Sequence, residues 1–204
     1  MALLTPYDDP EFRKSLECSM QKIAEVIGEK KELLKSFVIS TLPSGSVSAL
    51  IASNTWDNKK YIFVDVDISN FSLLLSKALA LCFCNISHVS NVKFDFHSSK
   101  CIKIARNDSI FKDSIIDLFR SASVIGYASG AKPWIMPDKG VYLAGILADS
   151  MNVFIIAHEV AHGMLGHLEA PNQTLSSEIL GDGVAMIMSH EDEFAADHEG
   201  LSYS

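Results

Sequence analysis

The chain has 204 residues, of which 48% are hydrophobic and 21% charged, and its formal net charge at pH 7 is −8. This composition is typical of a folded protein rather than a disordered one, and the length is sufficient to bury a sizeable core. The sequence has no run of basic residues that could release counterions from phosphates, so we expect no nucleic-acid partner.

Three features of the sequence favour a cytoplasmic protein without a membrane span. The segment "MALLTPYDDPEF" has neither the basic nor the apolar part of a secretory signal. The four cysteines, Cys18, Cys82, Cys84 and Cys101, follow no disulfide or zinc-finger spacing. The most hydrophobic stretch, residues 68–86, contains polar residues and repeats with helical period, which indicates a buried amphipathic helix.

The first half of the chain is expected to contain helices and short strands. Apolar residues recur at helical spacing over residues 9–39, which predicts one or two amphipathic helices. Residues 59–69 alternate and predict a strand, and residues 70–84 predict a helix. We interpret residues 91–98 and 100–106 as the two strands of a hairpin.

The second half is expected to be mostly helical. Residues 107–127 begin with capping residues and predict a helix. Residues 140–147, "GVYLAGIL", predict a strand, and residues 149–170 predict a helix capped at its first or second residue. Two further helices are expected over residues 176–190 and 191–201.

The predicted helix over residues 149–170 contains the motif His-Glu-Val-Ala-His, residues 158–162. Because residues four apart share one helical face, the imidazoles of His158 and His162 can reach one ion. Glu159 lies about 100° around the helix, where it can take a proton from water and pass it to a leaving amine. The alternative is two core histidines that are satisfied by backbone carbonyl groups.

A hydrolytic zinc site needs a third protein ligand. Glu193 and Asp197 are four apart on the last predicted helix, so Glu193 can bind the ion while Asp197 accepts the N–H of a ligating histidine. Glu178 and Asp182 share this spacing and remain an alternative, although two glycines beside Asp182 make a less rigid platform.

Two other residues are weaker candidates for the third ligand. His167 follows His158 by nine residues, which on a continuous helix puts it half a turn off the face of the motif. We therefore interpret His167 as a helix-end histidine after Gly166. Cys101 is a remote candidate, since nothing around it matches a known Cys…H-E-x-x-H loop.

The segments "HEVAHGMLGH" and "EFAAD" resemble the gluzincin metallopeptidases, with signature H-E-x-x-H…E-x-x-A-D. HtpX-type, ImmA/IrrE-type and Lit-type peptidases share this pattern, and the resemblance covers residues 140–199. It implies one Zn²⁺ per chain and an upstream strand whose edge binds the substrate, a place that residues 140–147 fit. It also implies His158, His162 and Glu193 as the zinc ligands and Glu159 as the base.

The sequence departs from these families in two respects. HtpX-type enzymes have membrane helices, whereas none is expected here. The chain also has only seven residues after Asp197, so no group that would stabilise the oxyanion is obvious. The candidates for that group are His190, Tyr142, His198 and Tyr203.

Together the elements and the motif predict an α+β fold. We expect a small mixed sheet packed on helices, a zincin-like active-site helix and a helical C-terminal third. A single domain over residues 1–204 is predicted, with a helical segment at 1–40, a mixed part at 60–148 and the zinc-site helices at 149–204.

The resulting hypothesis is a zinc-dependent peptidase that acts on a protein or peptide substrate. Two alternatives stay open. The first is a regulatory or sensing module that binds the metal but needs a partner or activator before it cleaves. The second is a non-enzymatic interaction domain in which the histidines are core residues.

Overall fold

The computed structural model describes most of the chain. The described residues are 9–54, 56–85, 93–94, 97–132, 136, 138–169, 175–180, 183–186 and 190–204.

The described chain divides into two compact units, each assembled from segments that are distant in sequence. The first unit consists of three segments: the described residues up to 42, residues 48–64, and the described residues of 152–204. The second contains residues 43–47 and 65–151. The expected α+β class with a small mixed sheet is confirmed, while the single domain stays a prediction.

The first unit begins with helix α1 (Pro10–Ile27), which the apolar periodicity predicted. Its N-terminus is capped by Asp9, whose side chain accepts a hydrogen bond from the backbone N–H of Phe12 at 2.9 Å. Leu16 and Ile23, seven residues apart, lie on its buried face.

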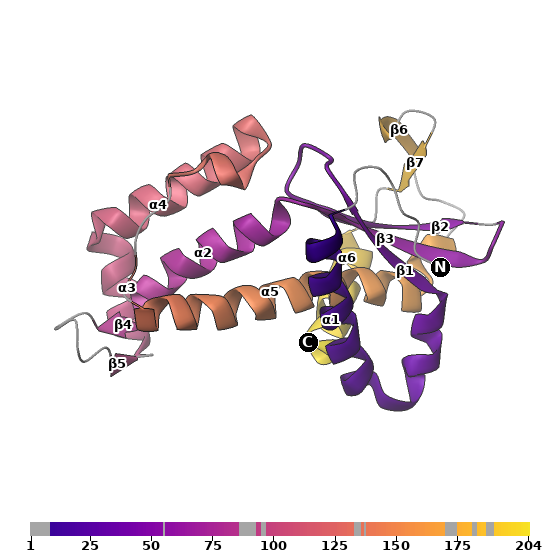
Figure 1. Cartoon of the computed structure of the whole chain (residues 1–204), viewed down its shortest axis with the longest axis horizontal. Coiled ribbons are helices and arrows are strands. Elements are labelled where there is room, and N and C mark those ends of the chain that lie inside the picture. The colour runs from indigo at the N-terminus through magenta and orange to yellow at the C-terminus, as the bar shows by residue number, and fades with distance from the viewer. Residues whose placement is uncertain are drawn as a thin grey trace. The chain divides into compact units, whose positions relative to one another are not determined.

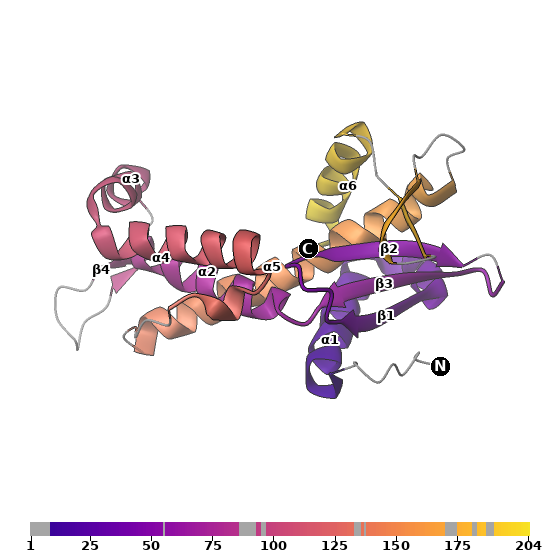
Figure 2. The ribbon, with the colours of Figure 1, turned by 90° about the horizontal axis from the view of Figure 1, so that it is seen from above.

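A small mixed sheet follows α1 and has the strand order β1-β3-β2, with β2 at one edge (Figure 2). Strands β2 and β3 are antiparallel, and Ile51 lies opposite Ile62. The predicted strand at residues 59–69 is confirmed by β3, but the last residues of the predicted 9–39 helix form β1. The β-branched residues at that end favour a strand. The segments, in chain order, are η1 (Gly28–Ser36), β1 (Phe37–Leu42), β2 (Ala49–Asn54) and β3 (Lys59–Asp65).

All three strands contact the long helix α5 (Asp138–Met164) at Gly163. A Cβ atom there would lie 2.6 Å from the ring of Phe37 on β1 and 3.0 Å from Ile51 on β2. Lys60 on β3 donates to the carbonyl oxygen of Gly163 and lies 5.6 Å from the centre of the Phe37 ring. The missing side chain at Gly163 therefore lets the sheet approach the end of α5.

The predicted strand at residues 140–147 is wrong, because these residues belong to α5, which begins eleven residues before the predicted start. A short apolar run does not distinguish a buried strand from a buried helix. By length and composition alone, Gly140–Met164 could cross a membrane, a property that core helices of soluble proteins share. The absence of a membrane span therefore stays a prediction.

The last part of the first unit contains two helices with a hairpin between them (Figure 1). The helix predicted over residues 176–190 is wrong, because β6 and β7 pair there as antiparallel strands. Serine and glycine, which are poor helix formers, are frequent in this segment. The helix predicted at residues 191–201 is confirmed by α6. The segments are η4 (His167–Glu169), β6 (Leu175–Leu180), β7 (Gly183–Met186) and α6 (His190–Tyr203).

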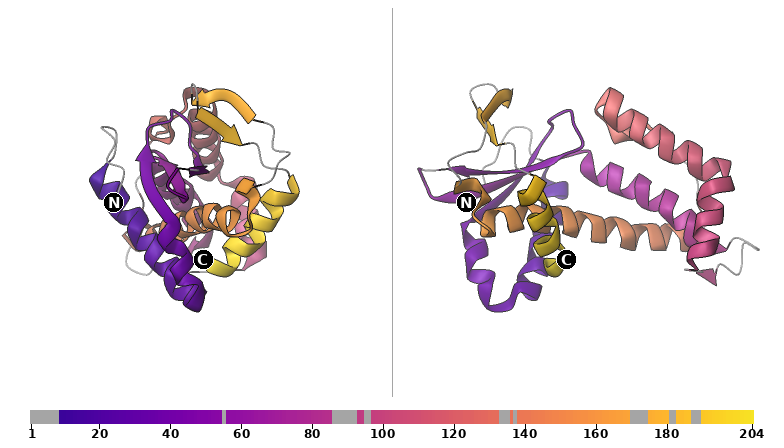
Figure 3. Two further views of the ribbon diagram at one scale, coloured as in Figure 1. Left: turned by 90° about the vertical axis from the view of Figure 1, so that its right-hand side faces the viewer. Right: turned by 180° about the vertical axis from the view of Figure 1, so that it is seen from behind.

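The second unit is mainly helical, and helices α2 and α4 lie side by side (Figure 3). Phe71 on α2 and Phe119 on α4 make an edge-to-face contact, with ring centres 5.5 Å apart. Both helices were predicted, but residues 100–106 form helix α3 rather than a strand, and β5 pairs with β4 instead. The segments are α2 (Ile68–Phe83), β4 (Cys84–Asn85), β5 (Lys93–Phe94), α3 (Ser98–Asn107), α4 (Ser109–Arg120), η2 (Ser121–Ile125) and η3 (Ala128–Gly130).

A buried carboxylate connects α2 with η3 in this unit. Asp67 is 5% exposed, and one of its oxygens accepts hydrogen bonds from the backbone N–H groups of Ala128 and of Ser129, the latter at 3.1 Å. Its other oxygen accepts from the side-chain amide of Asn70 at 2.7 Å. These donors offset the cost of burying the charge.

Candidate metal centre

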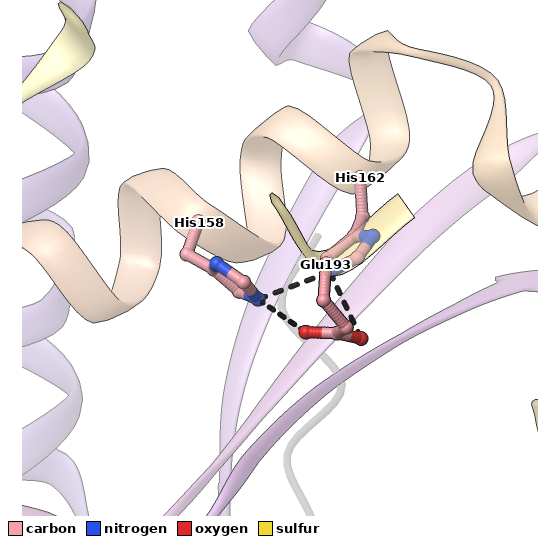
Figure 4. A group of neighbouring side chains, drawn as sticks. All are labelled: His158, His162 and Glu193. Atoms are coloured by element: carbon pink, nitrogen blue, oxygen red, sulfur yellow. Dashed lines mark hydrogen bonds and ion pairs between the residues drawn. The ribbon is translucent and has the colours of Figure 1, made fainter. Parts of the chain in front are cut away.

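Helices α5 and α6 bring together the three side chains His158, His162 and Glu193 (Figure 4). The two histidines are one turn apart on α5, and Glu193 comes from the first turn of α6. One ligand atom from each residue lies within 4.8 Å of the other two. The group could therefore hold a metal ion, as the sequence spacing predicted.

The spacing of the donor atoms is close to that around a tetrahedral ion. The two Nε2 atoms of His158 and His162 are 3.0 Å apart. Carboxylate oxygens of Glu193 lie 3.2 Å from Nε2 of His158 and 3.6 Å from Nε2 of His162. Ligands about 2.0–2.1 Å from a tetrahedral zinc ion would lie about 3.3–3.5 Å apart. The three side chains are therefore close enough to hold one metal ion between them.

The other ring nitrogens have partners of their own. Nδ1 of His158 lies 2.9 Å from a carboxylate oxygen of Asp197, which was the predicted partner of a ligating histidine. Nδ1 of His162 lies 2.9 Å from Nδ1 of His167. A histidine that gives its Nδ1 hydrogen to an acceptor presents an unprotonated Nε2, which is the form that binds a metal.

Glu159 lies beside this group and is the most perturbed carboxyl group of the site. Its residue is only 7% exposed. Burial, and secondly the negative charge of Glu193, raise the pKa of Glu159 to about 8. A carboxyl group with a pKa near neutrality can both accept and donate a proton at physiological pH.

Burial also acts on the second histidine. The His162 side chain is 3% exposed, against 17% for His158 and 45% for Glu193. Burial, followed by the neighbouring His158, lowers the pKa of His162. The neutral imidazole is therefore favoured, which is the protonation state that a metal ligand requires.

The group opens into a pocket of about 250 Å³ whose wall includes the edge strand. Ala49, Leu50 and Ile51 of β2 line it together with the three ligands and Glu159. Strand β2, at the edge of the sheet, therefore lies next to the ionisable groups. Residues 140–147 were expected to have this place, and they are helical.

The candidates for oxyanion stabilisation are not brought together by the structure. Among the described residues that line the pocket, His190, His198 and Tyr203 do not occur. His190 and His198 are exposed on α6, and the hydroxyl group of Tyr203 donates to Glu199. Tyr142 belongs to the other unit, where it is 70% exposed.

The alternative ligand pair is affected by the correction of residues 176–190. Glu178 lies on β6 rather than on a helix, and its side chain is outside the described residues, as is Asp182. The helical spacing that made this pair a candidate is therefore absent. Among the described residues, Glu193 is the carboxylate that joins the two histidines.

Sequence reasoning missed two features of this site. His167 was interpreted only as a helix-end residue, yet Gly166, with a left-handed φ of 76°, turns the chain so that His167 contacts His162. The glycine after the helix was the signal for this turn. Gly200 on α6 was also missed, and a Cβ atom there would lie 3.0 Å from the backbone nitrogen of His158.

Comparison of the chain with known protein families, with curated proteins and with solved structures gave no match.

Proposed function

We propose that the chain is a zinc-dependent peptidase that hydrolyses peptide bonds in a protein or peptide substrate. The observation that carries this proposal is the convergence of three ligand atoms beside a buried carboxyl group in one pocket. Two imidazole nitrogens and one carboxylate favour zinc over magnesium or calcium, which prefer oxygen ligands alone. Three protein ligands also leave one position open for water, as catalytic zinc sites require.

His158, His162 and Glu193 would hold the ion, and Glu159 would move the protons. A zinc ion bound there would polarise the substrate carbonyl group and make a water molecule more acidic. Glu159 accepts a proton from the attacking water and then donates it to the leaving amine. Its ionised form is favoured beside a bound cation, while burial keeps the protonated form accessible.

The edge strand β2 supports a peptide rather than a small molecule as the substrate. An unpaired strand edge can bind an extended peptide through backbone hydrogen bonds, as an added strand. Ala49, Leu50 and Ile51 line the pocket of the ligands, so a peptide along β2 would pass the site. In this proposal β2 replaces residues 140–147 as the strand that binds the substrate.

The test combines metal analysis with a peptide-cleavage assay on five proteins. Each purified protein is analysed for bound zinc and incubated with a library of quenched fluorescent peptides. The five proteins are the wild-type chain, His158→Ala, Glu193→Ala, Glu159→Gln and Glu191→Ala. We expect about one zinc per chain in the wild type and a loss of zinc in His158→Ala and Glu193→Ala. Glu159→Gln should keep zinc but cleave about 10²–10⁴ times more slowly, because it lacks the proton-transfer group.

Glu191→Ala is the matched control, because Glu191 is an exposed acid of the same helical turn as Glu193. It should match the wild type in both assays. A wild-type chain without zinc, or a Glu159→Gln variant that cleaves as fast as the wild type, would contradict the proposal. Bound zinc without cleavage would favour the regulatory module instead.

A further inference from the structure

The two histidines of the metal centre are supported in different ways. Nδ1 of His158 contacts a carboxylate directly, at 2.9 Å from Asp197. Nδ1 of His162 contacts a second imidazole, at 2.9 Å from Nδ1 of His167, and Nε2 of His167 lies 3.5 Å from a carboxylate oxygen of Asp192. We call the contacts behind each histidine an arm: His158 and Asp197 form one arm, and His162, His167 and Asp192 form the other. Helix α6 supplies the carboxylate of each arm.

We infer that His167 and Asp192 are positioning residues that set the tautomer of His162 and so make its Nε2 available to the metal. This inference rests on the metal centre of the proposed function. It assigns to His167 a role that neither the motif nor the spacing of the ligands requires.

The tautomers follow from a count of hydrogen atoms. Two Nδ1 atoms 2.9 Å apart need one donor and one acceptor. If His167 donated, a neutral His162 would carry its hydrogen on Nε2, where it would block the ion. If His167 accepts, His162 carries its hydrogen on Nδ1, and its Nε2 lone pair faces His158 and Glu193. Only the second arrangement leaves a metal ligand.

Asp192 selects this second arrangement. Its carboxylate lies beside Nε2 of His167 and favours a hydrogen on that nitrogen. When its hydrogen is on Nε2, His167 presents the lone pair of its Nδ1 to Nδ1 of His162 and accepts the hydrogen bond. The carboxylate therefore acts on the metal ligand through the intervening imidazole.

The three side chains differ in how far they are exposed. The exposed fraction of the side chain is 3% for His162, 12% for His167 and 32% for Asp192. Burying a carboxylate is costly, so the charge lies at the more hydrated end of the arm. The imidazole of His167 connects the more exposed Asp192 with the buried His162.

Helix α6 carries the carboxylates of both arms and also the third ligand. Asp192, Glu193 and Asp197 lie within two turns of this helix. Gly200 brings the same helix against the backbone of His158. A displacement of α6 would therefore loosen both histidines and the carboxylate ligand together, which makes metal affinity a sensitive readout of this arrangement.

The experiment measures the zinc dissociation constant by competition with a chromophoric chelator. His167→Leu removes the acceptor and should weaken zinc binding about 10- to 100-fold. His167→Asn keeps an acceptor oxygen close to the position of Nδ1 and should bind within a few-fold of the wild type. Asp192→Ala should weaken binding less than His167→Leu, because the ring remains in place.

His198→Leu and Glu191→Ala are the controls, since both residues are exposed on α6. Both should bind zinc like the wild type. Circular dichroism and thermal unfolding of each metal-free variant show whether it folds, and only folded variants are compared. A second readout, the nitrogen-15 spectrum of the metal-free chain, should show a hydrogen on Nδ1 of His162 in the wild type.

Two outcomes would overturn the inference while leaving the proposed function intact. One is wild-type zinc affinity in a folded His167→Leu. The other is equal weakening in His167→Asn and His167→Leu, which would indicate that His167 only fills space. A wild-type chain that binds no zinc is a different result, because it removes the metal centre itself.

Discussion

Each of the two units buries a carboxyl group, but the surroundings of the two groups differ. Asp67 in the second unit is 5% exposed and accepts hydrogen bonds from two backbone N–H groups and from the amide of Asn70. Glu159 in the first unit is 7% exposed and faces another carboxylate, which helps to raise its pKa to about 8. Asp67 is surrounded by donors, whereas Glu159 shares its pocket with the three candidate ligands, and the charge of Glu193 disfavours its ionised form.

The two histidines differ from Asp67 in the same way. Their Nε2 atoms lie 3.0 Å apart, and in the inferred tautomers both histidines carry a hydrogen on Nδ1, away from the space between the rings. Lone pairs brought this close repel each other unless a proton or a metal ion lies between them. Burial alone therefore does not distinguish the two carboxyl groups. They differ in whether the neighbouring groups satisfy the buried carboxyl group.

The largest expected effect that tests this comparison is the response of stability to zinc. If the cation satisfies the buried site, free zinc at 1,000 times its dissociation constant should stabilise the chain by about 4 kcal/mol. Thermal unfolding with and without a chelator measures this increment. His162→Ala should abolish it. Asn70→Ala removes a donor to Asp67 and should keep the full increment. A reduced increment in this variant would contradict the view that zinc stabilises only the site of the first unit.

A slightly smaller effect is expected for the acid of the second unit. Asp67→Ala leaves two backbone N–H groups without their acceptor and should destabilise the chain by about 3 kcal/mol, measured by urea unfolding in the presence of chelator. The exposed Asp113 is the matched control, and Asp113→Ala should change stability by less than about 0.5 kcal/mol. Weakened zinc binding in a folded Asp67→Ala would contradict a purely structural role.

The approach of α6 to α5 gives a third prediction. Gly200→Ala puts a Cβ atom 3.0 Å from the backbone of His158, so α6 must shift, at a cost of about 1–3 kcal/mol and with weaker zinc binding. Gly145→Ala is the control, because its Cβ atom would meet nothing within 4 Å in α5. That variant should be neutral or more stable by up to about 1 kcal/mol. Equal zinc affinities in the two variants would show that the helix contact does not position the ligands.

The last effect concerns a polar group of the first unit that has its own partner. Burial, and then the hydrogen bond to Glu199, raise the pKa of Tyr203 to about 12. Because the folded chain holds the phenol proton more tightly, its stabilising contribution is complete below pH 10 and decreases as the pH rises towards 12. Tyr203→Phe should remove this pH dependence, which amounts to about 2 kcal/mol between pH 9 and 11.5 and is measured by urea unfolding. This pH dependence of stability should be the same with and without zinc, because Tyr203 already has its own hydrogen-bond partner.

The features that depend only on neighbours along the chain could be predicted from the sequence. Helices α1, α2, α4 and α6 and strand β3 follow from periodicity and capping, as Asp108 shows by accepting from the N–H of Phe111 at the start of α4. The pairing of His158 with His162 is equally local, because residues four apart must share a helical face.

Tertiary structure decided the features for which local preference was ambiguous. Residues 140–147 are helical because they continue α5, although an apolar run of that length also suits a strand. The hairpin of β6 and β7 stands where a helix was predicted, since each strand supplies the hydrogen bonds of the other.

The candidate metal centre combines both kinds of feature. The residue types and spacing of the motif predicted a metal site, and the spacing of Glu193 and Asp197 made α6 a candidate source of the third ligand. The contact of His167 with His162 required the turn at Gly166, and the choice of β2 as the strand beside the site required the sheet to pack on Gly163. Such contacts depend on how closely whole elements approach each other. Small residues that are far apart in sequence control this distance, so it cannot be predicted from local periodicity.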